Sequence, residues 1–177
     1  MKRNLTAIAF GISLAYAAFP AFAQTSANVN QNGTGNDVYV EQSNAINSNA
    51  SVNQNGTDNK VGSSSSSTPG VLQQNSTNAY AYVDQSGNAN SANVTQDASN
   101  NVNANVYQGY SWWTSSNNSA ATVTQTSSSN ASAYVSQYGN NNAGTVSQNN
   151  VNSGGWWSSA GVGQYGNNNV GTVSQAD

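Results

Sequence analysis

The chain has no histidine and no cysteine, and only nine of its 177 residues are charged. The missing residue types exclude Ser-His-Asp and Cys-His triads, the usual zinc ligand sets and disulfide bonds. Lys2 and Arg3 lie at the very start, which leaves Lys60 as the one cation further on. With a formal net charge of −3, the chain also lacks a basic surface for phosphates. We therefore expect no enzyme, no cofactor, no metal site, and neither a nucleic-acid nor a small-molecule partner.

The first 23 residues form a distinct segment. A basic start is followed by an apolar run from Leu5 to about Phe19 and by the small-residue end Ala21-Phe22-Ala23. This is the three-part pattern of a secretory signal peptide, with cleavage expected before Gln24. A membrane anchor is the alternative, but the apolar run is shorter than the ~20 residues of a spanning helix. We expect a secreted protein.

What remains is rich in Asn, Gln, Ser and Gly and poor in large apolar side chains. Composition alone favours a disordered chain, because little apolar area is available to offset the entropy cost of ordering. A regular spacing of glutamine contradicts that interpretation. Steps of 11 and 12 residues alternate, with longer steps at three inserts, near 63–70, 110–117 and 152–158. The spaced residues are Gln31, Gln42, Gln54, Gln73, Gln85, Gln96, Gln108, Gln125, Gln137, Gln148, Gln164 and Gln175.

Other positions keep the same spacing. The residue two before each of these glutamines is valine in all twelve cases, and the residue four before is alanine in eight. Asparagine follows five residues later in nine cases, among them Asn36, Asn59, Asn90, Asn142 and Asn169. Glycine stands two residues after every other glutamine, with Tyr110 as the exception. The valines are Val29, Val40, Val52, Val71, Val83, Val94, Val106, Val123, Val135, Val146, Val162 and Val173.

The unit Ala-x-Val-x-Gln has a period of two, which predicts a strand with these three side chains on one face. The Gly and Asn that follow are turn residues. Each period of about 23 residues is thus strand, turn, strand, turn. Six periods begin near residues 31, 54, 85, 108, 137 and 164, within a repeat domain over 29–177 preceded by a short segment, 24–28.

One Ala, one Val and one Gln cannot form a core alone, but stacked coils can share one. Equivalent residues would lie about 4.8 Å apart, so that the valines form two apolar files and the Gln and Asn side chains form amide ladders. The sequence predicts an all-β fold, a two-sheet β-solenoid of about six coils. No segment resembles a polar cap, so both end coils expose strand edges that can template another chain. We expect the protein to polymerise as cross-β amyloid.

The segment from Gln85 to Gln96, with Gly87 and Asn90 between them, resembles the repeat of curlins, the subunits of bacterial curli fibres. So do 31–42, 137–148 and 164–175. The resemblance implies an extracellular functional amyloid of a Gram-negative biofilm matrix, with roles in adhesion and cell aggregation. It also implies a curli outer-membrane secretion pore and a minor nucleator curlin as partners. The acidic balance favours a major subunit.

The side chains outside this pattern leave alternatives open. The acids Asp37, Glu41, Asp58, Asp84 and Asp97 all avoid inward positions; they are either simply solvated or act as gatekeepers that slow premature pairing. Tyr39, Tyr82 and Tyr134 are expected on the outer face, either because tyrosine favours strands or for lateral packing between fibres. Two tryptophan pairs are expected to protrude from opposite edges, and the Ser-rich insert from the same edge as the first pair. The four tryptophans, either packed against the coil or in contact with a glycan or apolar surface, are Trp112, Trp113, Trp156 and Trp157.

Two rival functions remain. The first is a monomeric secreted β-helical module, either an adhesin or a ligand- or ice-binding domain. Ice binding would need a regular file of threonine, whereas Thr95, Thr122, Thr124, Thr145 and Thr172 are irregularly placed in the sequence. The second rival is a disordered matrix linker.

Overall fold

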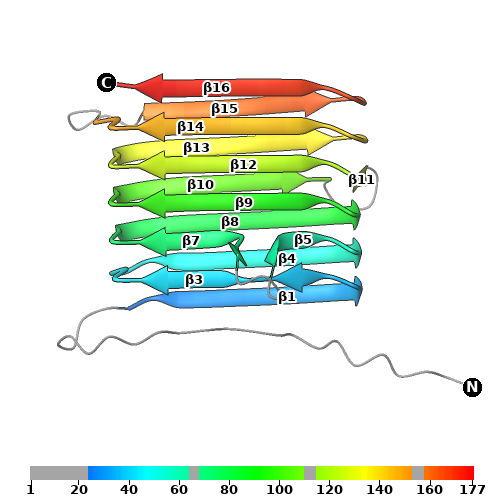
Figure 1. Cartoon of the computed structure of the whole chain (residues 1–177), viewed down its shortest axis with the longest axis horizontal. Coiled ribbons are helices and arrows are strands. Elements are labelled where there is room, and N and C mark those ends of the chain that lie inside the picture. Colours follow the sequence, from blue (N-terminus) through cyan, green and yellow to red (C-terminus); the bar gives the residue numbers. More distant parts are fainter. Residues whose placement is uncertain (1–23, 64–67, 110–114, 153–157) are drawn as a thin grey trace, which may run out of the picture.

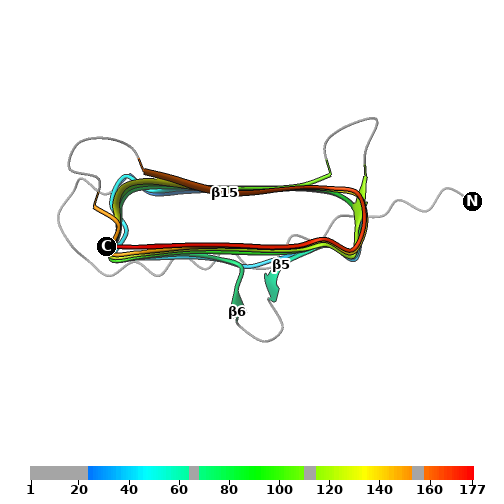
Figure 2. The same ribbon diagram turned by 90° about the horizontal axis from the view of Figure 1, so that it is seen from above.

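The structure, a computed structural model, describes residues 24–63, 68–109, 115–152 and 158–177. Parallel strands stack as a two-sheet β-solenoid, as the repeat predicts (Figure 1). Seen along the stack, the coils superimpose as a flattened loop with one sheet on each long side (Figure 2). The strands are β1 Ser26–Thr34, β2 Asp37–Val38, β3 Val40–Ser43, β4 Asn49–Thr57, β5 Lys60–Ser63, β6 Thr68–Pro69, β7 Val71–Gln74, β8 Thr77–Asn88, β9 Ser91–Asp97, β10 Asn100–Gln108, β11 Ser116–Asn117, β12 Ala120–Thr126, β13 Ser129–Tyr138, β14 Ala143–Asn149, β15 Ser158–Tyr165 and β16 Val170–Ala176.

The two sheets alternate along the chain. Sheet 1 has the order β1-β4-β8-β10-β13-β15, and sheet 2 has the order β16-β14-β12-β9-β5-β2, with β3 and β7 continuing its first two layers. The register keeps the sequence pattern throughout: Val52, Val83 and Val106 are direct partners, as are Val94 and Val123. Because side chains alternate across a strand, this register places every repeat Ala, Val and Gln in the interior.

The interior is a narrow apolar core between the sheets. Ten of the twelve repeat valines are buried, and the two exceptions, Val29 and Val173, belong to the end layers and pack against the core from there. The repeat alanines, two residues before the valines on the same inward face, belong to the same core cluster. Burial of apolar area supplies the main stabilising term, at about 25 cal/mol per Å².

Turns on the two narrow edges differ in their conformation. We call the narrow edge at which the chain leaves sheet 1 the asparagine edge. The narrow edge at which it leaves sheet 2 is the serine edge. At the asparagine edge Gly56 and Gly87 have φ of 130° and 120°. A Cβ on Gly56 would lie 1.9 Å from the carbonyl oxygen of Gly87. Glycine is therefore required by the close approach of successive turns as well as by its φ.

The Ser-rich insert does not lie at a turn, so its expected place on the same edge as the first tryptophan pair is wrong. It leaves the middle of a sheet 2 strand: β5 and β6 pair as antiparallel strands and project from the face of that sheet (Figure 2). Val61 pairs with Ala92, and Val71 resumes the strand opposite Val94. Val61 thus takes the inward position that the sequence pattern gives to Pro69, because a valine fills the core and a proline cannot donate to the ladder.

Candidate functional site

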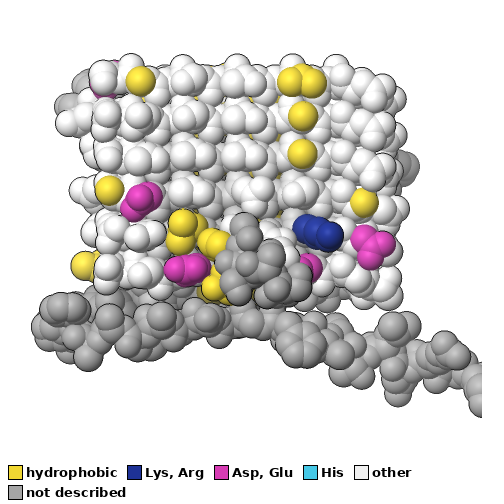
Figure 3. Space-filling view, in the orientation of Figure 1, with side chains coloured by type: hydrophobic (Ala, Val, Ile, Leu, Met, Phe, Trp, Pro, Cys, Tyr) yellow, Lys and Arg dark blue, Asp and Glu magenta, His cyan; other side chains and the backbone are white. Residues whose placement is uncertain are grey.

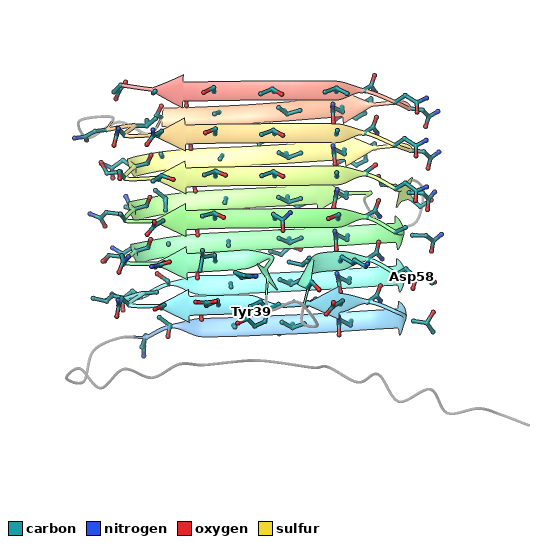
Figure 4. The ribbon with its side chains drawn as sticks, viewed as in Figure 1. Tyr39 and Asp58 are labelled. Atoms are coloured by element: carbon teal, nitrogen blue, oxygen red, sulfur yellow. The ribbon has the colours of Figure 1, made fainter. Side chains whose placement is uncertain are left out.

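Two ladders of glutamine amides run the length of the interior. In sheet 1 each Nε2 donates to the Oε1 of the next glutamine, at 2.7–3.0 Å, through Gln31, Gln54, Gln85, Gln108, Gln137 and Gln164. In sheet 2 the distances are 2.7–2.9 Å, through Gln42, Gln73, Gln96, Gln125, Gln148 and Gln175. Figure 4 shows how side chains of successive layers align in columns. The glutamine ladders predicted from the sequence are confirmed.

The second N–H of many of these amides joins the two sheets. Nε2 of Gln85 donates to the backbone oxygen of Lys60 at 3.2 Å, and Nε2 of Gln137 donates to that of Ala120 at 2.9 Å. In the other direction, Nε2 of Gln96 donates to the carbonyl of Tyr80 at 3.0 Å. One interior amide therefore makes contacts along the stack and across it, and no buried side-chain N or O atom of the described residues lacks a partner.

The asparagines behave differently from the expected amide ladder. At the asparagine edge, Oδ1 of Asn59 accepts the backbone N–H of Asn90 at 3.0 Å, and Nδ2 of Asn90 donates to the carbonyl of Ser116 at 2.6 Å. Asn36 relates to Asn59 in the same way. Among the five asparagines of the predicted ladder, only Asn169 donates to the side-chain oxygen of another, that of Asn142, at 3.1 Å. These five side chains bond the backbone of the turns. Other asparagines do form side-chain ladders between layers, such as Asn101 with Asn130 at 2.7 Å and Asn117 with Asn140 at 2.8 Å.

The fourth repeat lacks the glycine and the asparagine of the sequence pattern, and two serines take their places. Ser116 pairs with Gly87 and takes the glycine position. Ser119 takes the asparagine position, because its N–H donates to Oδ1 of Asn90 at 3.1 Å and its Oγ accepts the N–H of Asn142 at 3.3 Å. The insert displaces both from the expected spacing, which is why sequence reasoning missed them.

A file of buried serines along the serine edge was also missed. Ser76, Ser99 and Ser128 each stand three residues after a sheet 2 glutamine. The hydroxyl of Ser99 donates to the carbonyls of Asp97 at 2.9 Å and Gln125 at 3.2 Å, while Oγ accepts the N–H of Ser128 at 3.3 Å. The signal was present in the sequence as that recurring serine.

Both ladders are incomplete at the end layers. Among the described residues, the first layer lacks hydrogen-bond donors for the ladders, and the last layer lacks acceptors for them. Both ladders donate toward the C-terminal end, so the first layer has glutamine oxygens without a donor among the described residues: Oε1 of Gln31 and of Gln42. In the last layer, Nε2 of Gln164 donates only to the backbone oxygen of Ala143, and Nε2 of Gln175 has no acceptor in the part of the chain that is described. One end offers acceptors and the other offers donors.

Each end layer also has a strand edge whose backbone has no partner strand among the described residues. Among the described strands, β1 pairs only with β4, β15 only with β13, and β16 only with β14. An unpaired strand edge of parallel register is a template for another strand. The two end layers also repeat one pattern: Ala27, Val29 and Gln31 in β1 correspond to Ala160, Val162 and Gln164 in β15.

None of the five acids outside the terminus is buried. Asp84, on the outer face of sheet 1, accepts hydrogen bonds from Tyr82 at 3.3 Å and from Asn53 at 3.4 Å. Partial burial removes water from the Asp84 carboxyl and raises its pKa above the usual value, and the two hydrogen bonds oppose that shift. Burial and the Asp84 charge raise the pKa of Tyr82 to about 12. Tyr134 is 44% exposed on the same face.

The four tryptophans and Tyr110 lie outside the described residues. The residues that flank the tryptophan inserts lie on opposite edges: Ser116 pairs with Gly87 at the asparagine edge, and Asn152 bridges to Ser129 at the serine edge. Within the described ranges, no group of three acids gathers as a metal site. Nor does any helix there have the length and hydropathy to cross a bilayer.

Comparison of the chain with protein-family models, with curated proteins and with solved structures found no match.

Proposed function

We propose that this protein is a secreted structural subunit whose folded copies stack end to end into an extracellular cross-β fibre. The observation that carries the proposal is the complementarity of the end layers. The C-terminal layer offers amide N–H groups at Gln164 and Gln175, and the N-terminal layer offers amide oxygens at Gln31 and Gln42. A second copy placed above the first would continue both ladders and both sheets with the spacing that already relates the coils.

The interior supports this stacking because it needs no new kind of contact. Ala27 would meet Ala160, and Val29 would meet Val162, as alanine and valine meet their equivalents in β4 and β8. Laddered amides can stack at the ~4.8 Å strand spacing without the repulsion that like charges would produce. The scarcity of charge in the sequence is therefore consistent with a polymer.

The resemblance to curlins favours a biological setting for such a fibre. It is the matrix of a Gram-negative biofilm, where the fibre contributes to adhesion and cell aggregation. A curli outer-membrane pore would export the chain, a minor nucleator curlin would start growth, and this protein would be the major subunit. Export further rests on the signal-peptide pattern of residues 1–23.

The chain from Gln24 onward, purified as monomer and held at micromolar concentration, tests the proposal. We expect a lag, then thioflavin-positive fibres that seed fresh monomer and bind Congo red. A chain that stays monomeric and thioflavin-negative for days, with a β-rich circular dichroism spectrum, would instead support the monomeric adhesin or ligand-binding module. A random-coil spectrum would support the disordered linker.

A further inference from the structure

The outer face of sheet 2 carries a regular grid of small polar side chains over its last four layers. In β9, β12, β14 and β16 the threonines that are irregularly placed in the sequence line up in register: Thr122, Thr145 and Thr172 are successive partners, and so are Thr95 and Thr124. We call the two files together the threonine array. It consists of Asn93, Thr95, Thr122, Thr124, Thr145, Ser147, Thr172 and Ser174.

The hydroxyl groups of this array are available to solvent. Thr145, Thr172 and Ser174 are exposed, and the other members are half-buried. None of their side chains has a hydrogen bond to another described residue. A third file, of Ala120, Ala143 and Val170, runs beside them. Figure 3 shows these layers as regular columns, whereas the charged side chains lie mainly over the first layers.

The grid has two fixed repeats. Along the stack, equivalent hydroxyls are separated by the strand spacing of about 4.8 Å, and within a strand the i and i+2 side chains are about 6.6 Å apart. The backbone ladder holds both repeats, and β-branched threonine has few χ1 rotamers. A rigid, uncharged grid of hydroxyl and methyl groups imposes its own order on the first layer of water, because each hydroxyl can both donate and accept.

We propose that the threonine array binds the surface of ice. Prism faces of ice present oxygen atoms at repeats close to these two, so waters held by the array can belong to the crystal lattice. Other occupants fit less well. A second copy of the face is held off by the β5–β6 projection, and the array has no aromatic side chain on which a sugar ring could stack. The array is complete in one chain, so the inference does not depend on the fibre.

The area of one array is small, about 14 Å by 7 Å between the outermost hydroxyls. A fibre of end-to-end copies would repeat it every six layers on one face, and linked sites on one surface dissociate far more slowly than separate ones. We therefore expect polymerised chain to inhibit ice recrystallisation at a lower subunit concentration than monomer.

The test compares two single substitutions in the same coil, Thr145→Lys in the array and Ser132→Lys on the outer face of sheet 1. Each is assayed for ice recrystallisation inhibition and thermal hysteresis, as monomer and as fibre, with circular dichroism as the control for folding. We expect the unaltered chain to inhibit recrystallisation, S132K to match it, and T145K to need at least about tenfold more protein.

Thr145→Val, which keeps the shape and removes the hydroxyl, separates loss of the grid from loss of the fold and should give an intermediate value. The inference is overturned if folded, unaltered chain leaves ice growth unchanged in both states, or if T145K and S132K lose activity equally. It is also overturned if the face proves to bind an insoluble polysaccharide or another copy while ice is unaffected. Fibre formation is scored separately, so a chain that makes no fibres but inhibits recrystallisation refutes only the proposed function.

Discussion

Interior layers and end layers of the solenoid contain the same residues with different numbers of partners. Gln96, in the interior, is 0% exposed; its oxygen accepts from Gln73 and its Nε2 donates to Gln125 and to a backbone oxygen. Gln175, in the last layer, accepts from Gln148 at 2.8 Å and has no acceptor for its own N–H groups among the described residues. An end layer thus resembles an interior layer, but it contacts one neighbouring layer instead of two.

If copies stack end to end, stability and assembly depend on the same contacts. A residue that stabilises an interior layer would stabilise the junction between two copies when it lies at an end. Substitutions at interior and end positions should therefore separate the two properties, although the side chains are identical.

The largest effect is expected for Gln96→Ala. The change removes two ladder hydrogen bonds, leaves the oxygen of Gln125 without its donor, and opens a cavity in a packed interior. We expect a loss of about 3–5 kcal/mol in the free energy of unfolding of the monomer. Gln175→Ala, the matched end substitution, should cost less than about 1 kcal/mol. Denaturant unfolding of freshly prepared monomer measures both, and equal losses would contradict the comparison.

The second-largest effect is expected on the rate of fibre elongation, in a variant that still folds. In Gln175→Glu, one carboxylate oxygen can still accept from Gln148, while the other replaces the outward N–H with an acceptor. The oxygen of Gln42 in an incoming copy would then face a negative charge. We expect unfolding stability within about 1 kcal/mol of the unaltered chain and elongation at least about tenfold slower, measured with preformed seeds.

A mixing experiment is the control for that variant. Q175E keeps an intact N-terminal layer, with Gln31 and Gln42 unchanged, so it should join the C-terminal end of a growing fibre and block further addition there. A small fraction of Q175E should therefore slow growth of unaltered chain by more than its share of the total. Inhibition that is only proportional to dilution would contradict the donor–acceptor complementarity of the ends.

A smaller effect is expected for the outward acids. Replacing Asp84 and Asp97 by Asn leaves the interior ladders intact but removes charges that repel when chains approach. The lag before fibre growth should shorten by a factor of about two to five at low salt, as read by thioflavin fluorescence. Ser132→Asn provides a neutral control on the outer face. An unchanged lag would leave these acids as merely solvated groups.

The smallest effect is the pH dependence of Asp84. Because burial raises the pKa of this carboxyl in the folded chain, the folded state binds the proton more tightly than the unfolded state does. Its stabilising contribution is full below the ordinary aspartate pKa and is lost as the pH rises through the raised value. Unfolding free energy should rise by less than about 1 kcal/mol on acidification, and Asp84→Asn should remove that slope. A slope unchanged in D84N would assign it to other acids.

Much of the fold follows from sequence because its layers repeat one simple pattern. Val, Ala and Gln at alternating positions determine the inward face, and the glutamine spacing determines how the layers stack. Two glutamines with equivalent surroundings must meet at the strand spacing, so the ladders could be predicted without coordinates.

Other features depend on which residue fills a place after an insertion. Val61, rather than Pro69, completes a core layer, and Ser119 replaces an asparagine, because the chain can loop out and return wherever a suitable side chain is available. The asparagine contacts depend on how each turn directs the side chain, and the alignment of Thr145 with Thr172 depends on register across an insert. Spacing along the chain does not reveal these features.

The most direct test of end-to-end stacking is the axial rise per subunit in the fibre, measured by cryo-electron microscopy or by mass per length. Six layers at the strand spacing give a rise of about 29 Å per chain, with strands perpendicular to the axis and no break in the ~4.8 Å repeat between copies. That value, with one chain per rise, is the predicted result. A fibre whose chains lie side by side, or whose rise does not correspond to six layers, would contradict the account.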